Sequence, residues 1–298
     1  MLARLLRRLL LTQFLLGVAL GYWFGGAVVA LLVGAVLPFA VMVITDIVSA
    51  LRSRADESSS AWWRSLWGEF GAGIHVFIFR QPWTRKTPTV LLPVTPVNPV
   101  RVPVLLVHGY LCNHRVWDNA AHALRQQGHT VLAINLEPVF ASIDQYADAI
   151  EPAVQQLRAA TGRDKVVLVG HSMGGLAIRA WMRAHGTQHA AGAITLGTPH
   201  MGTQIAKGQH TPNGRQMEWH SDWLAALAQG ETEEIRALFQ IAITPQDNIV
   251  YPQRAQVLPG TTATVFDGLG HLQLCLDPSV LQWLLARVAE LDIPTANT

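Results

Sequence analysis

The 298-residue sequence is poor in cysteine and in paired histidines, and both shortages limit what the protein can be. Its only cysteines are Cys112 and Cys275, which excludes a disulfide framework and a cysteine-rich zinc site. One disulfide stays open, and each cysteine is also plausible as a small buried residue. The twelve histidines show neither H-E-x-x-H nor another paired short spacing, so the sequence predicts no metal site.

Charged residues are also scarce, at 14% of the chain, whereas hydrophobic residues make up 50%. This composition is apolar for a soluble protein and indicates that part of the chain contacts lipid. The net charge is only +2, and no Lys/Arg cluster with interleaved aromatic residues occurs in the C-terminal two thirds. We therefore exclude nucleic acid as a partner.

The apolar excess is concentrated near the N-terminus, where residues 9–45 contain no charged side chain. As one helix this run would reach about 55 Å, against about 30 Å for the hydrocarbon core of a bilayer. Gly25 and Gly26 interrupt it directly after three aromatic residues that suit a membrane interface, 22–24. We therefore expect residues 1–54 to be a membrane anchor of two transmembrane helices joined by a turn.

Charges flanking the run predict its orientation. The run is preceded by Arg4, Arg7 and Arg8 and followed by Arg52 and Arg54. The turn carries no arginine. Since positive flanks stay inside, two crossings of a bacterial inner membrane place the rest of the chain in the cytoplasm. One alternative is a single anchor with a periplasmic domain. Another is a secretory signal that ends near Val48-Ser49-Ala50, although the apolar core of such a signal, usually about 7–15 residues, is shorter than this run.

Residues 55–101 are expected to connect this anchor to the rest of the chain. After a polar link at 55–60, aromatic and aliphatic residues recur at helical spacing, namely Trp63, Trp67, Phe70 and Ile74. This stripe fits a helix lying on the membrane or one packed on the next domain, and amphipathic spacing alone cannot separate the two. Six prolines then occur in residues 82–103, which predicts a linker or an extended edge segment.

From residue 102 onward, apolar runs alternate with segments of helical spacing, which predicts a parallel sheet covered by helices on both faces. We assign residues 102–298 to one α/β domain. Strands are expected at 102–107, 130–136, 165–169, 191–196, 239–243 and 263–266, and helices at 116–127, 142–160, 176–185 and 280–291.

A nucleophile motif follows the third of these strands. The sequence Gly170-His171-Ser172-Met173-Gly174 matches G-x-S-x-G and lies between a buried strand and a helix. In such an elbow the serine occupies a strained turn, and the two glycines allow strand and helix to approach closely. The sequence therefore predicts Ser172 as a catalytic nucleophile.

A serine nucleophile needs a base and an acid, which follow it in the order Ser, Asp or Glu, His. We expect His271 to be the base, because it follows the last strand in a glycine-rich loop. Asp247 lies just past the strand at 239–243 and is expected to orient the imidazole, with Asp267 as its main competitor. The amides of Met173 and Tyr110 are the expected oxyanion donors, with Leu111 next after Tyr110.

Five motifs in this order resemble bacterial lipases and esterases of the α/β-hydrolase superfamily. They are His108-Gly109-Tyr110, Gly170-His171-Ser172-Met173-Gly174-Gly175, Leu196-Gly197-Thr198-Pro199-His200-Met201-Gly202-Thr203, Gln246-Asp247-Asn248-Ile249-Val250 and Gly268-Leu269-Gly270-His271. The resemblance covers about residues 102–292. It implies hydrolysis of carboxylic esters of lipids or other apolar acyl groups through an acyl-enzyme, without a cofactor.

Several functions remain open at this stage. An alcohol or amine that intercepts the acyl-enzyme would make the same site an acyltransferase, and a thioester substrate would make it a thioesterase. A membrane-bound interaction protein with an inactive hydrolase fold is a further alternative. The N-terminal third has no counterpart in secreted lipases, and residues 202–238 suggest a modest cap over the site.

Overall fold

The computed structural model describes residues 1–54, 58–85 and 87–292. In this part of the chain a six-stranded sheet has the order β2-β1-β3-β4-β5-β6, and all its neighbouring strands are parallel. The predicted parallel sheet is confirmed. Its strands are β1 (Val104–Val107), β2 (Val131–Ile134), β3 (Val166–His171), β4 (Ala190–Leu196), β5 (Phe239–Ile243) and β6 (Ala263–Val265).

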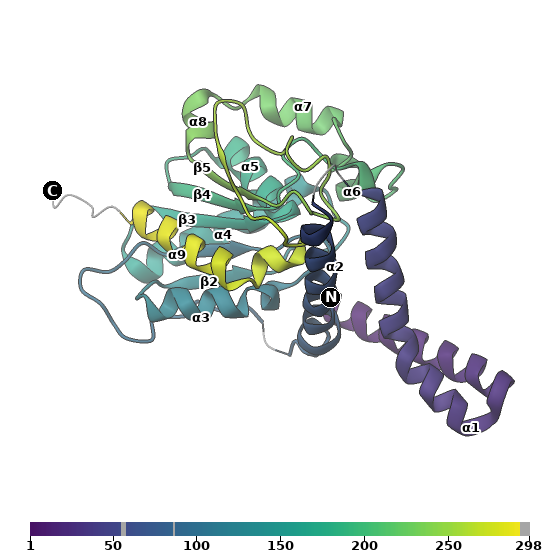
Figure 1. Ribbon diagram of the computed structural model, residues 1–298. Helices are drawn as coiled ribbons and strands as arrows, with labels where there is room; N and C mark the ends of the chain where they lie inside the picture. Colours follow the sequence, from purple (N-terminus) through teal and green to yellow (C-terminus); the bar gives the residue numbers. More distant parts are fainter. Residues whose placement is uncertain (55–57, 86, 293–298) are drawn as a thin grey trace.

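Helices cover both faces of the sheet, as Figure 1 shows. On one face lie α4 (Ile143–Thr161) and α5 (Met173–His185), whose buried residues form one core with inward residues of β1 and β3. On the other lie α3 (Asp118–Gln126) and α9 (Pro278–Leu291), whose buried residues form a second core. Because both faces are buried, β1, β2 and residues 166–169 of β3 are continuous apolar runs without polar alternation.

The segment between β4 and β5 contains three short helices, two of which lie at the top of the view on the β5 side of the sheet (Figure 1). They are α6 (Pro212–Gln216), α7 (Asp222–Gln229) and α8 (Glu233–Ala237). Thr211, Ser221 and Thr232 cap them through their side-chain oxygens, each accepting from a backbone N–H. No residue of 202–238, where a modest cap was expected, is among the described residues that line the cavity at Ser172.

The N-terminal run is helical over α1 (Leu2–Arg52), which is interrupted at Gly25 and Gly26. The chain reverses there, so a first arm (residues 2–24) lies against a second arm (residues 27–52) and both project from the sheet domain (Figure 1). A Cβ on Gly17 would lie 2.7 Å from Gly34 Cα, and one on Gly21 would lie 2.6 Å from Ala30 Cα. Small residues therefore set how closely the two arms approach.

By length and composition, α1 is the one helix of the described residues that could cross a membrane. Only 11% of its most apolar 18-residue window is buried. Trp23 and Phe24, at the far tip, are 85% and 80% exposed. The arms thus present a large apolar surface that neither the sheet domain nor the opposite arm covers.

Helix α2 (Ser59–Gly73) packs between α1 and the sheet domain, and continues into the π-helical turn η1 (Ile74–Arg80) and the 3₁₀ turn η2 (Gln81–Trp83). Its buried face carries Trp62, Leu66 and Glu69, whereas Trp63 and Trp67 of the stripe noted in the sequence are exposed. Of the predicted polar link, residues 55–57 lie outside the described part. The proline-rich segment then bonds to β2, because Leu91 and Val131 exchange backbone hydrogen bonds of 2.8 and 2.9 Å.

Candidate active site

Ser172 occupies the sharp turn between β3 and α5. Its φ of 54° and ψ of −129° are strained for a residue with a side chain. A Cβ on Gly174 would lie 2.2 Å from the Val107 carbonyl oxygen, and one on Gly170 would lie 2.6 Å from the Gly175 nitrogen. Glycine is required at both positions because strand and helix backbones nearly touch, as a nucleophile elbow demands.

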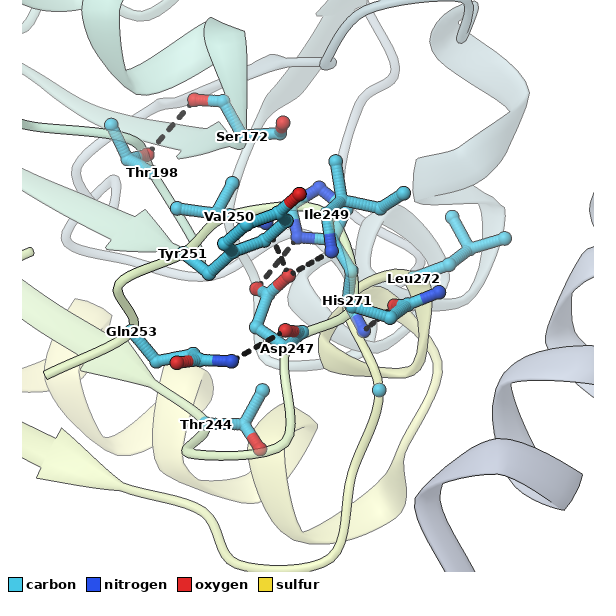
Figure 2. Close-up of polar contacts among 12 residues, drawn as sticks. Ser172, Thr198, Thr244, Asp247, Ile249, Val250, Tyr251, Gln253, His271 and Leu272 are labelled. Atoms are coloured by element: carbon cyan, nitrogen blue, oxygen red, sulfur yellow. Dashed lines mark hydrogen bonds and ion pairs between the residues drawn. The ribbon is translucent and has the colours of Figure 1, made fainter. Parts of the chain in front are cut away.

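Asp247 and His271 form a hydrogen-bonded pair at the carboxyl end of the sheet, as Figure 2 shows. Asp247 follows β5, and its Oδ2 lies 2.7 Å from His271 Nδ1. Its other oxygen accepts backbone hydrogen bonds from Ile249 (2.9 Å) and Val250 (2.7 Å). These amides hold the carboxylate so that it can fix the imidazole tautomer with the proton on Nδ1.

Burial alone disfavours the charged form of His271, which is 6% exposed. The charge and hydrogen bond of Asp247, together with the charge of Glu69, outweigh burial and raise the His271 pKa above its ordinary value. A raised pKa strengthens the ring as a proton acceptor, which suits a general base.

Ser172 and His271 line the same cavity, which has a volume of about 400 Å³. Within the described residues no hydrogen bond joins the Ser172 hydroxyl to the His271 ring. Hydrogen bonds between catalytic groups often tighten only around a bound substrate, so this geometry is compatible with proton transfer. Asp267, which carries the competing carboxylate, is exposed. Its backbone carbonyl oxygen accepts a hydrogen bond of 3.0 Å from the Arg64 guanidinium.

The expected oxyanion donors belong to two segments of the chain, the start of α5 and the turn after β1. Met173 begins α5, so its N–H has no intrahelical acceptor. Tyr110 and Leu111 form a turn closed by a 3.2 Å hydrogen bond from Cys112 N–H to the Gly109 carbonyl, and both line the cavity. Leu111 has a φ of 54°, a strain that is often stored at functional sites.

His108 and His171 lie near the site in packed surroundings. His108 Nε2 accepts from Leu136 N–H at 2.9 Å while its Nδ1 bonds the Gly109 carbonyl, and burial lowers its pKa to about 4. His171 Nε2 bonds the His271 carbonyl at 3.1 Å, and burial lowers its pKa well below the ordinary value. Both rings are therefore neutral, and their hydrogen bonds fix the two loops around Ser172.

Glu69 of α2 was not selected from the sequence, yet it contacts the loop that carries the base. It is 7% exposed and accepts backbone hydrogen bonds from Leu272 (2.8 Å) and Gln273 (3.1 Å), directly after His271. Burial raises its pKa to about 7, against the lowering effects of His271 and these two amides. A sequence signal existed, since Glu69 is the only acidic residue between Glu57 and Asp118.

The two cysteines are free and buried. Burial raises the pKa of Cys112 to about 12 and that of Cys275 well above its ordinary value, so neither is a reactive thiolate. The disulfide left open by the sequence is not formed. Within the described residues, no group of three or more His, Cys, Asp or Glu side chains is placed to hold a metal ion.

Comparison with known proteins supports the fold described above. Residues 102–229 match a family model described as the alpha/beta hydrolase fold. This part of the chain has the α/β-hydrolase fold. Over 115 residues the chain is 36% identical to triacylglycerol lipases of Pseudarthrobacter phenanthrenivorans and Burkholderia plantarii. The matched region covers 36% of this chain but only 35% and 32% of those lipases, about a third of their length.

Solved structures share the fold at low sequence identity. The Bacillus licheniformis lipase BlEst2 in its propeptide form matches with a TM-score of 0.57 and 19% identity, covering 71% of this chain and 55% of that one. Aspergillus fumigatus lipase B matches with a TM-score of 0.57 and 14% identity, covering 67% and 56%. These similarities establish the architecture of the α/β-hydrolase domain.

Proposed function

We propose that this protein is a serine hydrolase that cleaves carboxylic esters of lipids or other apolar acyl groups through an acyl-enzyme. The observation that carries the proposal is the Asp247–His271 pair, whose histidine lines one mainly apolar cavity with the strained Ser172. The similarity to two triacylglycerol lipases supports an ester substrate. No step of this chemistry requires a metal or a cofactor.

In the proposed reaction Ser172 Oγ attacks the ester carbonyl carbon while His271 Nε2 takes its proton. The negative charge that develops on the carbonyl oxygen is stabilised by the N–H groups of Met173 and Tyr110. His271 then gives its proton to the departing alcohol, which leaves the acyl group on Ser172. A water molecule, deprotonated by His271, releases the acid and restores the serine.

The proposal is tested with the purified full chain in detergent and a series of p-nitrophenyl esters from acetate to palmitate. We expect hydrolysis of this series, with a preference for the longer acyl chains because the cavity is mainly apolar. Adding an alcohol or a thioester substrate distinguishes transferase and thioesterase activity. Absence of turnover with every substrate would contradict the proposed function.

We further propose that α1 is a two-pass hairpin in a bacterial inner membrane, with the hydrolase domain in the cytoplasm. Both ends of α1 contact that domain: the N-terminal ammonium pairs with Glu137, and Ser49 Oγ donates to the Asn248 carbonyl. Two ends on one side require an even number of crossings, and their flanking arginines favour the cytoplasm.

Reporter fusions at the C-terminus test this topology. We expect a reporter that fluoresces only in the cytoplasm to be bright, and one active only in the periplasm to be silent. A matched variant without residues 1–26 keeps one arm, and its membrane orientation checks that the reporters respond to topology. Periplasmic activity of the full chain would contradict the hairpin and favour the single anchor.

Glu69→Gln is expected to shift the pH profile of ester hydrolysis. The Glu69 charge helps to raise the pKa of His271, and only the neutral ring can accept the Ser172 proton. Above the Glu69 pKa of about 7, where this carboxyl is ionised, removing its charge lowers the His271 pKa, so the acidic limb of kcat/KM should move to lower pH. Glu233→Gln, on the exposed start of α8, is the matched control. Identical profiles for Glu69→Gln and the wild type would show that Glu69 acts only structurally.

A further inference from the structure

The cavity at Ser172 is enclosed in part by residues outside the hydrolase domain. One wall of the cavity comes from the two arms of α1, and the rest comes largely from the domain that carries Ser172. The wall from the arms includes Leu6 and Leu10 of the first arm and Pro38 and Met42 of the second. The cavity volume of about 400 Å³ falls in the range of about 300–1,000 Å³ for ligand-binding pockets. The segment that anchors the chain is thus also part of its catalytic cavity.

Each arm faces the cavity along one helical stripe. On the second arm the lining residues Pro38, Val41, Met42 and Thr45 recur at i, i+3, i+4 and i+7, the spacing of a single face. Other faces of the arms are uncovered, and Leu32 on this arm is 61% exposed. A helix is about 10 Å across, so one layer of helix separates the cavity from the surroundings of the arms.

The cavity lies near the base of the arms. Leu9 and Thr45, the two ends of the uncharged run, both line it, whereas Trp23 at the tip is 14 residues from Leu9, about 21 Å along a helix. Exposed Trp63 and Trp67 of α2 lie on the helix that bonds the base of α1, where Trp62 Nε1 donates to the Ala50 carbonyl at 3.3 Å. Tryptophan favours the interface, so the cavity is at the level of the leaflet next to the hydrolase domain.

The charges of the cavity restrict its ligand. Asp46 and Glu69 are its two carboxylates, and none of its described lining residues is lysine or arginine. An anionic headgroup would therefore find no counter-charge, whereas an uncharged one meets no repulsion. The remaining lining is mainly apolar and suits an acyl chain.

We propose that the two arms of α1 form the acyl-binding wall of the active site, through which an uncharged ester lipid of the adjacent leaflet reaches Ser172. This inference rests on the proposed function and adds a binding role for residues outside the family domain. The acyl chain packs against the two stripes that include Leu10 and Met42, which leaves the ester at Ser172 and the headgroup beside the ester within the cavity.

The test uses the full chain in phosphatidylcholine vesicles that contain dioleoylglycerol, with p-nitrophenyl acetate as the soluble reference ester. Leu10→Trp and Met42→Trp fill the wall; Leu15→Trp and Leu32→Trp place the same side chain on exposed faces of the same arms. We expect the wall variants to lower the ratio of the dioleoylglycerol rate to the acetate rate by about tenfold or more, since small displacements of a bound substrate cost up to about a hundredfold. The exposed-face variants should keep the wild-type ratio.

Equal ratios in the wall and exposed-face variants would overturn the proposal while leaving ester hydrolysis intact. Failure of the proposed function is distinguishable, because the wild type would then hydrolyse neither ester. If a tryptophan variant fails to fold, Met42→Ala gives a second test: a wider cavity should change the preference among p-nitrophenyl acyl chains, and an unchanged preference would contradict the wall.

Vesicles with dioleoylphosphatidylglycerol as substrate test the headgroup, and hydrolysis as fast as that of dioleoylglycerol would contradict selection for an uncharged lipid.

Discussion

Ser172→Ala should lower ester hydrolysis by about 10⁴- to 10⁶-fold, as removal of a catalytic serine does in other hydrolases. Alanine keeps the Cβ that packs beside Gly109 and removes only the hydroxyl, so the domain should remain folded. Initial rates with p-nitrophenyl butyrate, together with thermal unfolding in detergent, measure both effects.

The matched control is Ser279→Ala, which removes an exposed hydroxyl at the start of α9 and should hydrolyse at the wild-type rate. Turnover by Ser172→Ala at a level similar to that of the control would rule out Ser172 as the nucleophile. A loss accompanied by unfolding would instead show a structural role for the hydroxyl.

The second large effect is expected for the acid. Asp247→Asn should lower turnover by up to about 10⁴-fold, because asparagine cannot hold the imidazole in the tautomer with its proton on Nδ1. The 2.7 Å contact between Asp247 Oδ2 and His271 Nδ1 is the geometric basis. Asp267→Asn, which changes an exposed side chain in the loop of His271, should alter turnover by less than about threefold.

Comparing kcat for these two variants at several pH values ranks the carboxylates. Asp247→Asn also removes the largest influence that raises the His271 pKa, so any residual activity should extend to lower pH. A larger loss in Asp267→Asn than in Asp247→Asn would mean that the wrong carboxylate has been assigned.

The sheet could be predicted closely from the sequence because its strands are buried on both faces. The expected strand at 239–243 coincides with β5, and the expected 191–196 differs from β4 by one residue. The helix after the elbow was expected from residue 176 but begins at Met173. The expectation started too late because Gly174 and Gly175, which are poor helix formers, occupy the first turn. Periodicity cannot detect a helix start that close packing imposes.

The surroundings of the site were harder to predict, because they depend on contacts between distant segments. Trp63 and Trp67 share a helical stripe with Phe70, yet the face of α2 that packs on the hydrolase domain carries Trp62 and Glu69. A single amphipathic pattern cannot distinguish a face that meets protein from one that meets lipid. The contact of Glu69 with the loop of His271 spans about two hundred residues of sequence and has no local signature.

The same limit applies to the wall of the cavity. Leu10 and Met42 are ordinary residues of an apolar run, and only the reversal at Gly25 and Gly26 brings both beside Ser172. Length indicated that the chain turns, and Gly25 and Gly26 indicated where, but hydropathy is uniform along the arms and does not reveal which face meets the hydrolase domain.

Labelling with a fluorophosphonate probe tests the central claim most directly, because the probe reacts with a serine only when an adjacent base activates it. The full chain is labelled in detergent, digested, and mapped by mass spectrometry, with Ser172→Ala and Asp247→Asn treated in parallel. The account predicts one modified residue, Ser172, no label in Ser172→Ala, and slower labelling in Asp247→Asn. An unlabelled wild type, or a label on another serine, would contradict it.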